Sequence, residues 1–193
     1  MAKKYLTSDW HIGEKSTPNT HSFLRPRPTE LMVAEWMKQC REMVQGADIL
    51  FFLGDVGITL DDLAVCRFLP DCHKILILGD KEYSNKNFDK ATFLAENKRL
   101  GIFDTVVENT IVDIAGREYF LSHKPTDCLE QPLPALCGHI HGIWRSARMP
   151  TGQPIINVGI DAWGGLVTED FVEHQYNAIT KFYDVNAFPA QWQ

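Results

Sequence analysis

The chain has 193 residues, of which 45% are hydrophobic and 23% are charged. This length and balance predict a single domain over residues 1–193 with a well-buried core, because two ordinary domains and a linker would need a longer chain. The formal net charge of −6 argues against a broad basic surface that would hold nucleic acid stably, and it favours a small partner.

Few features of the sequence indicate the cellular compartment of the protein. The five cysteines include no Cys-x-x-Cys pair, and the N-terminal residues do not resemble a signal peptide. No apolar stretch approaches the roughly 20 residues that cross a bilayer. These features predict a cytoplasmic protein without a membrane partner.

The first half of the chain alternates between apolar runs and helical patterns. Residues 4–8 predict a short strand, and an apolar stripe over 30–45 predicts a helix. The nearly continuous apolar runs 49–53 and 74–78 predict strands that are buried on both faces, with a helix over 61–69 between them. This order predicts parallel strands joined by helices.

The second half is richer in strand patterns. After a helix predicted over 88–97, the segments 110–114 and 118–122 predict a hairpin that turns at Gly116, and this hairpin begins a second sheet. The remaining expected elements are short strands around Leu136 and over 155–158, a short helix capped by Thr168, and a β-like stretch over 178–184.

Residue types that bind metal ions follow several of the predicted strands. They are Asp9, His11, Asp55, His123, His139 and His141. On a continuing strand, Asp9 and His11 would point to the same face, so both could reach one ion. A carboxylate at a strand end, such as Asp55, can bridge two cations with its two oxygens.

Most of these motifs have an ordinary explanation when each is taken alone. Asp9 and His11 would be ordinary loop residues, Asp55 after Gly54 would belong to a turn, and His123 would be an ordinary hydrogen-bonded side chain. The sequence Gly138-His139-Ile140-His141 is more specific, because the glycines leave room for imidazoles to approach an ion. Together the motifs predict two divalent ions about 3.5–4 Å apart, which would activate a bridging water or hydroxide for attack on a phosphoester.

In their order, these motifs resemble those of the calcineurin-like metallophosphoesterase superfamily. That family has Asp-x-His, Gly-Asp, Gly-Asn-His-Asp/Glu, a single His and Gly-His-x-His in succession, and the resemblance covers about residues 4–165. It is strongest for the small single-domain bacterial and phage branch; for a phage protein, the compartment would be the host cytoplasm. The resemblance implies an α/β fold, a four-layer α/β/β/α sandwich of two mixed β-sheets flanked by helices.

The resemblance also implies a ligand set for two divalent metal ions. One ion would bind Asp9, His11 and His141, the other would bind Asp80, His123 and His139, and Asp55 would bridge them as part of the catalytic centre. Mn²⁺ is the favoured cofactor, and Fe, Zn or Ni are also compatible with mixed imidazole and carboxylate ligands.

The third motif departs from the family pattern, because residues 79–82 are Gly-Asp-Lys-Glu. Asp80 replaces a neutral Asn and adds a negative charge while keeping an oxygen ligand. Lys81 replaces a His beside the phosphate; we expect it to bind substrate and to act in catalysis through its charge, although an ammonium group gives up a proton less readily than an imidazolium. Alternatively, Lys81 forms an ion pair with Asp80 or Glu82 and is lost to the substrate.

The sequence therefore predicts a dinuclear metal-dependent phosphoesterase. Its substrates would be small phosphomonoesters or phosphodiesters, with nucleotides among the candidates, and Arg25 in the loop after the first motif would contact the phosphate unless it is an ordinary solvated charge. A non-catalytic metal-binding scaffold of the same fold is the main alternative, since the third motif is altered. A nuclease is less favoured, because no basic groove is evident.

Overall fold

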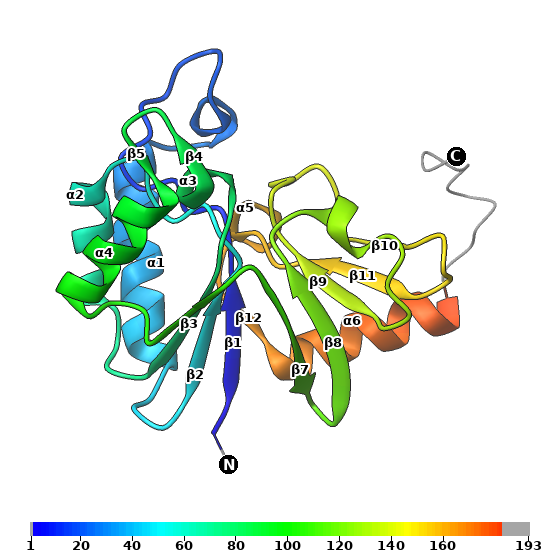
Figure 1. Ribbon diagram of the computed structural model, residues 1–193. Coiled ribbons are helices and arrows are strands. Elements are labelled where there is room, and N and C mark those ends of the chain that lie inside the picture. Colours follow the sequence, from blue (N-terminus) through cyan, green and yellow to red (C-terminus); the bar gives the residue numbers. More distant parts are fainter. Residues whose placement is uncertain (1, 183–193) are drawn as a thin grey trace.

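The computed structural model describes residues 2–182, which form two five-stranded β-sheets flanked by helices (Figure 1). In the first sheet, β1 (Lys4–Thr7), β2 (Ile49–Phe52), β3 (His73–Ile77) and β6 (Thr105–Val107) run parallel, and β12 (Val167–Thr168) pairs antiparallel with β1. This sheet is therefore mixed, with the order β12-β1-β2-β3-β6.

The second sheet has the order β10-β11-β9-β8-β7 and is also mixed. Its strands are β7 (Asn109–Ile114), β8 (Arg117–Ser122), β9 (Ala135–Cys137), β10 (Ser146–Arg148) and β11 (Pro154–Asn157). β9 pairs in parallel with β8 and β11, whereas β7 and β10 form antiparallel edges. A separate small hairpin joins β4 (Ser84–Asn85) to β5 (Phe88–Asp89).

Three helices, α1 (Thr29–Met43), α2 (Leu60–Leu63) and α4 (Lys90–Leu100), lie on the outer face of the first sheet (Figure 1). α6 (Glu169–Phe182) lies along the second sheet and contacts β10 and β11. The short helical segments are α3 (Asp80–Tyr83), α5 (Ile160–Trp163), η1 (His21–Leu24), η2 (Ala64–Phe68) and η3 (Pro125–Cys128). The predicted α/β sandwich of two mixed sheets flanked by helices is confirmed.

The central strands of the first sheet are apolar on both faces because both faces are covered. In β2, Leu50 and Phe52 face α1, whereas Phe51 faces the second sheet and packs in the core between the sheets. On the helix side, α1 contributes Met32, Val33, Trp36, Met37 and Cys40. This packing fixes the strand ends of the first sheet relative to the second.

Several predicted elements are confirmed, and others differ. The helix expected over 88–97 is α4, which begins only at Lys90 because Phe88 and Asp89 form β5. The strands expected over 4–8, 49–53 and 74–78 correspond to β1, β2 and β3 and are parallel, and Thr168 Oγ1 accepts the Phe171 N–H (3.2 Å) at the start of α6. The β-like stretch expected over 178–184 is wrong up to Phe182, because these residues continue α6; residues 183 and 184 lie outside the described range. The helix expected over 61–69 is α2 followed by the 3-10 segment η2.

The short strands β6, β10 and β12, which consist of two or three residues each, were not predicted from the sequence. Such short strands are formed by pairing with neighbours, and they lack the length for a periodic pattern. Within residues 2–182, no helix combines the length and the apolar character needed to cross a membrane.

Candidate metal centre

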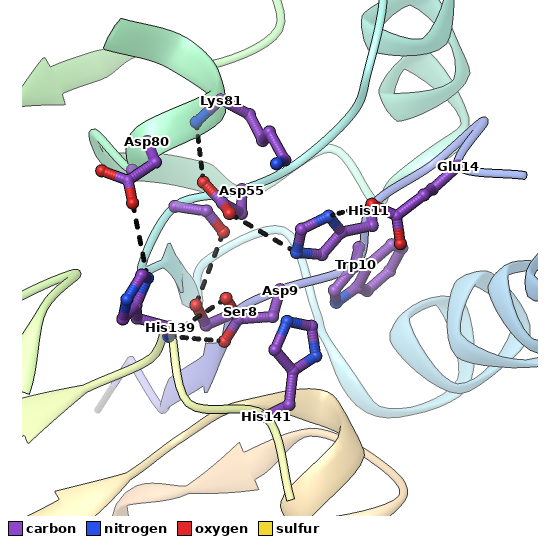
Figure 2. Close-up of polar contacts among 12 residues, drawn as sticks. Ser8, Asp9, Trp10, His11, Glu14, Asp55, Asp80, Lys81, His139 and His141 are labelled. Carbon is purple, nitrogen blue, oxygen red and sulfur yellow. Dashed lines mark hydrogen bonds and ion pairs between the residues drawn. The ribbon is translucent and has the colours of Figure 1, made fainter. Parts of the chain in front are cut away.

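The predicted ligands meet where the strands of both sheets end. Asp9 follows β1, Asp55 follows β2, Asp80 follows β3, His123 follows β8 and His139 follows β9. Because the carboxyl ends of parallel strands share one edge of a sheet, residues far apart in the sequence converge there. Figure 2 shows the side chains of Asp9, His11, Asp55, Asp80, His139 and His141 around a common centre.

An unusual backbone conformation marks this centre. Five of the predicted ligands have positive φ, namely Asp9 (62°), His11 (49°), Asp55 (54°), His139 (73°) and His141 (49°). Among the non-glycine residues that the structure describes, only Ala115 in the β7–β8 turn shares this feature. Left-handed backbone costs a side-chain-bearing residue about 1 kcal/mol or more, and it persists where the surroundings hold it and where function requires it.

Hydrogen bonds between the strand-end loops impose this conformation. The N–H groups of Asp9 and His11 donate to the carbonyls of Gly54 (3.1 Å) and Asp55 (3.0 Å). The buried carboxylate of Glu82 accepts the N–H groups of Asp55, Val56 and Gly79 at 2.8–2.9 Å. Burial and the neighbouring Asp55 raise the pKa of Glu82. Glu82 therefore joins the loops after β2 and β3, a role that the sequence did not predict.

Two glycines allow these loops to approach each other. A Cβ on Gly79 would lie 2.6 Å from both the backbone nitrogen and Oδ1 of Asp55. Gly54 has φ +85°, and a Cβ there would lie 2.6 Å from the Cα of Gly79 and from Nδ1 of His123. Any side chain at either position would displace Asp55 or His123.

The first ligand group consists of Asp9, His11 and His141, which offer donor atoms within 4.8 Å of one another. All three side chains are buried. The carboxylate of Asp9 also accepts the backbone N–H of His139, at 3.0 and 2.9 Å to its two oxygens, so the loop after β9 is held against the loop after β1.

The second ligand group consists of Asp80, His123 and His139, again with donor atoms within 4.8 Å of one another. His123 is buried, and its Nδ1–H donates to the Leu53 carbonyl (2.6 Å), which directs Nε2 towards the centre. Asp80 and His139 are more open, with side-chain exposures of 43% and 41%.

Asp55 lies between the two groups. Its Oδ2 is 3.4 Å from His11 Nε2, and its Oδ1 is 3.5 Å from His123 Nε2. Asp9, Asp55 and His123 also form a third set of clustered donors. Two ligand atoms that each lie about 2.1 Å from one ion are about 3.0–3.4 Å apart, so these separations are close to those expected around a shared cation.

Unpaired nitrogens provide an independent test of whether these residues suit metal ions. His11 Nε2 and His123 Nε2 are buried and make no hydrogen bond within the described part of the chain. Buried polar atoms are normally hydrogen-bonded, and a buried imidazole nitrogen that makes no hydrogen bond is suited to bind a metal. The donor set of imidazoles and carboxylates fits divalent transition metals.

The charge balance at the centre favours ionised carboxylates. Burial acts to raise the pKa of Asp55, but His123 and His11 outweigh it and hold the pKa below the ordinary value. Burial likewise opposes charging of His123, but Asp9 and Asp55 outweigh it and raise the pKa of this imidazole. Burial and the nearby His123 lower the pKa of His139. Anionic oxygens and imidazoles are thus held together, with Asp55 and His123 buried and His139 partly exposed.

Arg25 does not lie where we expected it. Its guanidinium is 2% exposed, and its five N–H groups are directed to the carboxylate of Asp161, the carbonyls of Asp9 and Trp10, and Thr29 Oγ1, at 2.6–3.3 Å. No donor remains for a phosphate, so the prediction that Arg25 contacts the substrate is wrong. Arg25 instead supports the backbone that carries the first ligand group.

Asp161 connects Arg25 to the first ligand group. Its Oδ2 lies 2.6 Å from His141 Nδ1, which leaves Nε2 of the imidazole as the ligand atom. The Asn157 side-chain amide donates to the His141 carbonyl (2.6 Å) and so holds the same loop. The hydrogen bonds to His141 and Arg25 outweigh burial and lower the pKa of Asp161.

The third motif has a charge partner that the sequence did not reveal. Asp80 Oδ1 pairs with Lys124 Nζ at 2.6 Å. Within residues 2–182 Lys81 forms no ion pair closer than 4.0 Å, so the alternative in which it pairs with Asp80 or Glu82 is wrong. The Lys81 backbone N–H donates to Asp55 Oδ1 (2.9 Å), and Figure 2 shows its side chain extending past Asp55 on the side of His11.

Comparison with known proteins supports the fold. No protein-family model matches the sequence, and no curated protein matches it. A crystal structure of a protein of unknown function from Aquifex aeolicus is similar, with a TM-score of 0.67 and 20% identity over 91% of this chain and 100% of that chain. An archaeal phosphodiesterase has a TM-score of 0.51 and 17% identity over 83% of this chain and 86% of that one. At these identities, the similarity establishes a shared fold.

Proposed function

We propose that the protein is a metal-dependent phosphoesterase that hydrolyses small phosphomonoesters or phosphodiesters, with nucleotides among its candidate substrates. The observation that carries the proposal is the position of Asp55 between two groups of clustered donors, with the buried Nε2 atoms of His11 and His123, which make no hydrogen bond in the described part of the chain, 3.4 and 3.5 Å from its carboxylate. The fold shared with an archaeal phosphodiesterase agrees with this class of reaction.

In this proposal, Asp9, His11 and His141 hold one divalent ion and Asp80, His123 and His139 hold the other, with Asp55 shared between them. When bound, two such ions polarise a phosphoryl oxygen and make water a stronger nucleophile near neutral pH. Mn²⁺ is the preferred ion, and Fe, Zn or Ni would also suit these ligands.

Side chains outside the ligand set orient the ligands and balance the charge of the centre. Asp161 and Arg25 orient His141, and the Leu53 carbonyl orients His123. Lys124 cancels the charge that Asp80 adds to the centre, so the positive charge of Lys81 stays available for a phosphate. Lys81 would stabilise negative charge that develops on the phosphoryl oxygens.

A test begins with protein that has been stripped of metal and resupplied with Mn²⁺, Ni²⁺ or Zn²⁺. Hydrolysis of bis-p-nitrophenyl phosphate and p-nitrophenyl phosphate would separate diesterase from monoesterase activity. We expect metal-dependent turnover that falls at least a hundredfold in Asp55→Ala, since one residue serves both ions. Asp113→Ala, a change in an exposed carboxylate on β7, is the matched control and should leave turnover unchanged.

A non-catalytic metal-binding scaffold of the same fold is the second candidate, favoured by the presence of Lys81 where the family has an imidazole. It predicts that the loaded protein binds two ions but hydrolyses neither ester. Turnover in the wild type that Asp55→Ala abolishes would reject the scaffold, whereas full metal binding without turnover would reject the phosphoesterase.

A further inference from the structure

An apolar pocket opens beside the first ligand group. Its volume is about 460 Å³, which is within the range of small-molecule sites. Apolar side chains make up most of its wall, namely Leu24, Pro26, Met32, Ile140, Ile143 and Ile160. We call this space the His141 pocket, because His141 belongs both to its wall and to the first ligand group.

His21 joins the pocket to the candidate metal centre. Its ring stacks on His141, with a centroid separation of 4.0 Å and an interplanar angle of 11°, and lies 5.7 Å from the ring of His11. His21 belongs to η1, in the loop that also supplies Leu24 to the wall. A molecule whose phosphate is bound at the first ligand group would therefore have this pocket directly beside it.

The charged residues in the wall are already engaged. Arg25 directs its N–H groups to Asp161, Thr29 and backbone carbonyls, and Asp161 accepts from both Arg25 and His141. The pocket thus offers apolar surface more than hydrogen bonds. An occupant would be selected by shape and by the burial of apolar area.

The opposite side of the centre differs in its chemistry. A pocket of about 380 Å³ beside the second ligand group is lined by the carboxylates of Asp80, Glu108 and Asp127, with Lys124 as the cation among them. The carboxylates repel an anionic ester, and Leu78 and Tyr83 offer less apolar surface there than the wall of the His141 pocket does. The organic part of a phosphoester would therefore be better accommodated in the His141 pocket.

The rim of the His141 pocket carries unusually exposed apolar side chains. Leu24 is 81% exposed and Ile143 is 80% exposed. Leu24 is the last residue of η1, and Ile143 follows the Gly138–His141 motif. Both line the same pocket. Apolar groups that gather at the mouth of a cavity indicate a ligand that buries them.

We propose that the His141 pocket binds the organic group of the substrate, and that this group is apolar and at least as large as a phenyl ring. This inference rests on the proposed function, because the phosphate is taken to lie at the metal centre. His21, Leu24 and Ile143 contact this apolar group and determine specificity, whereas the reacting atoms lie at the centre itself.

The test compares two ligands that cannot be hydrolysed, phenylphosphonate and methylphosphonate, by calorimetry on Mn²⁺-loaded protein. Both carry the same phosphonate group, so a difference in affinity reports the organic group. We expect phenylphosphonate to bind about tenfold more tightly, because the ring would bury apolar area against the wall. Leu24→Ser and Ile143→Ser, which alter exposed side chains, should each reduce this preference severalfold.

Ile111→Ser is the matched control, since Ile111 is an aliphatic side chain on β7 that is 53% exposed and does not line the pocket. It should leave the phenyl preference unchanged. Equal affinity for the two phosphonates, a preference unaffected by Leu24→Ser and Ile143→Ser, or no binding of either ligand would overturn the inference.

Turnover of bis-p-nitrophenyl phosphate, measured in parallel, separates this inference from the proposed function. Metal-dependent turnover without a phenyl preference would support the phosphoesterase and reject the His141 pocket as the site of the organic group. A phenyl preference that Leu24→Ser removes, in a protein without turnover, would support the pocket as a ligand site and reject the catalytic function.

Discussion

The two ligand groups differ in how firmly the protein holds them. In the first ligand group, all three residues are buried and all three have left-handed backbone. In the second ligand group only His139 has positive φ, and the side chains of Asp80 and His139 are more than one-third exposed. The first group is a preorganised site, whereas two of the three side chains in the second are partly exposed and one of them, Asp80, forms a surface charge pair.

This difference has a consequence for metal binding. Ligands held in place before an ion arrives lose less conformational entropy when it binds. We therefore expect the ion at the first ligand group to bind more tightly and exchange more slowly. The ion at the second ligand group should respond more strongly to the charges of Asp80 and Lys124.

We expect the largest effect from a substitution that removes the side chain supporting the first ligand group. Asp161→Ala would leave Arg25 as a buried charge without its carboxylate, and it would free His141 to rotate. We expect the free energy of unfolding to fall by about 3–5 kcal/mol and the affinity of the first ion to fall about 10–100-fold. Urea unfolding and Mn²⁺ calorimetry measure the two effects.

Asp113→Ala is again the control: it removes an exposed pair with Lys4 and a hydrogen bond from the Gly116 N–H, so it should cost at most about 1 kcal/mol and leave both metal affinities unchanged. If Asp161→Ala weakened the binding of the second ion alone, or left both affinities unchanged, the first ligand group would not depend on support from Asp161.

An intermediate effect is expected where the loops of the two groups are joined. Glu82→Gln would replace a carboxylate that accepts three backbone N–H groups by an amide with a single acceptor oxygen. We expect metal-free protein to lose about 1–3 kcal/mol of unfolding free energy. Glu118→Gln, at an exposed position near the start of β8, should lie within about 0.5 kcal/mol of wild type. Equal stability of the two variants would show that Glu82 does not hold these loops.

The smallest effect concerns the second ligand group. Asp80→Asn would remove a negative charge and leave Lys124 unpaired, so the second ion should bind up to about fivefold more weakly. Lys124→Met would leave the charge of Asp80 uncompensated, so the second ion should bind more tightly by a similar factor. Lys38→Met on exposed α1 is the control. Mn²⁺ calorimetry reports both variants, and shifts of the same sign would contradict the assigned charge pair.

The sequence predicted the convergence of the ligands because their positions follow from strand order. Asp9, Asp55 and Asp80 each follow a parallel strand, and parallel strands end at the same edge. The residues that hydrogen-bond to the ligands or pair with their charges were harder to predict. Asp161 lies 136 positions from Arg25, and Asp80 and Lys124 follow strands of different sheets, so no local pattern connects them.

Two wrong predictions have clear physical reasons. Arg25 lies in a polar loop with several prolines, where an arginine is normally solvated, but η1 and α1 place its side chain against the backbone of Asp9. Ile179 and Thr180 favour strands by local propensity, yet Val172 and Ile179 pack in the core between the sheets at a spacing that suits a helix. Burial of the apolar face of α6 outweighs local propensity there.

The most direct test of the two-group centre is a crystal structure of Mn²⁺-loaded protein with an anomalous difference map. We predict two peaks about 3.5–4 Å apart, one beside Asp9, His11 and His141 and one beside Asp80, His123 and His139, with Asp55 between them. At limiting Mn²⁺, the peak at the first ligand group should be the stronger. A single peak at saturating Mn²⁺, or peaks away from these residues, would contradict the account.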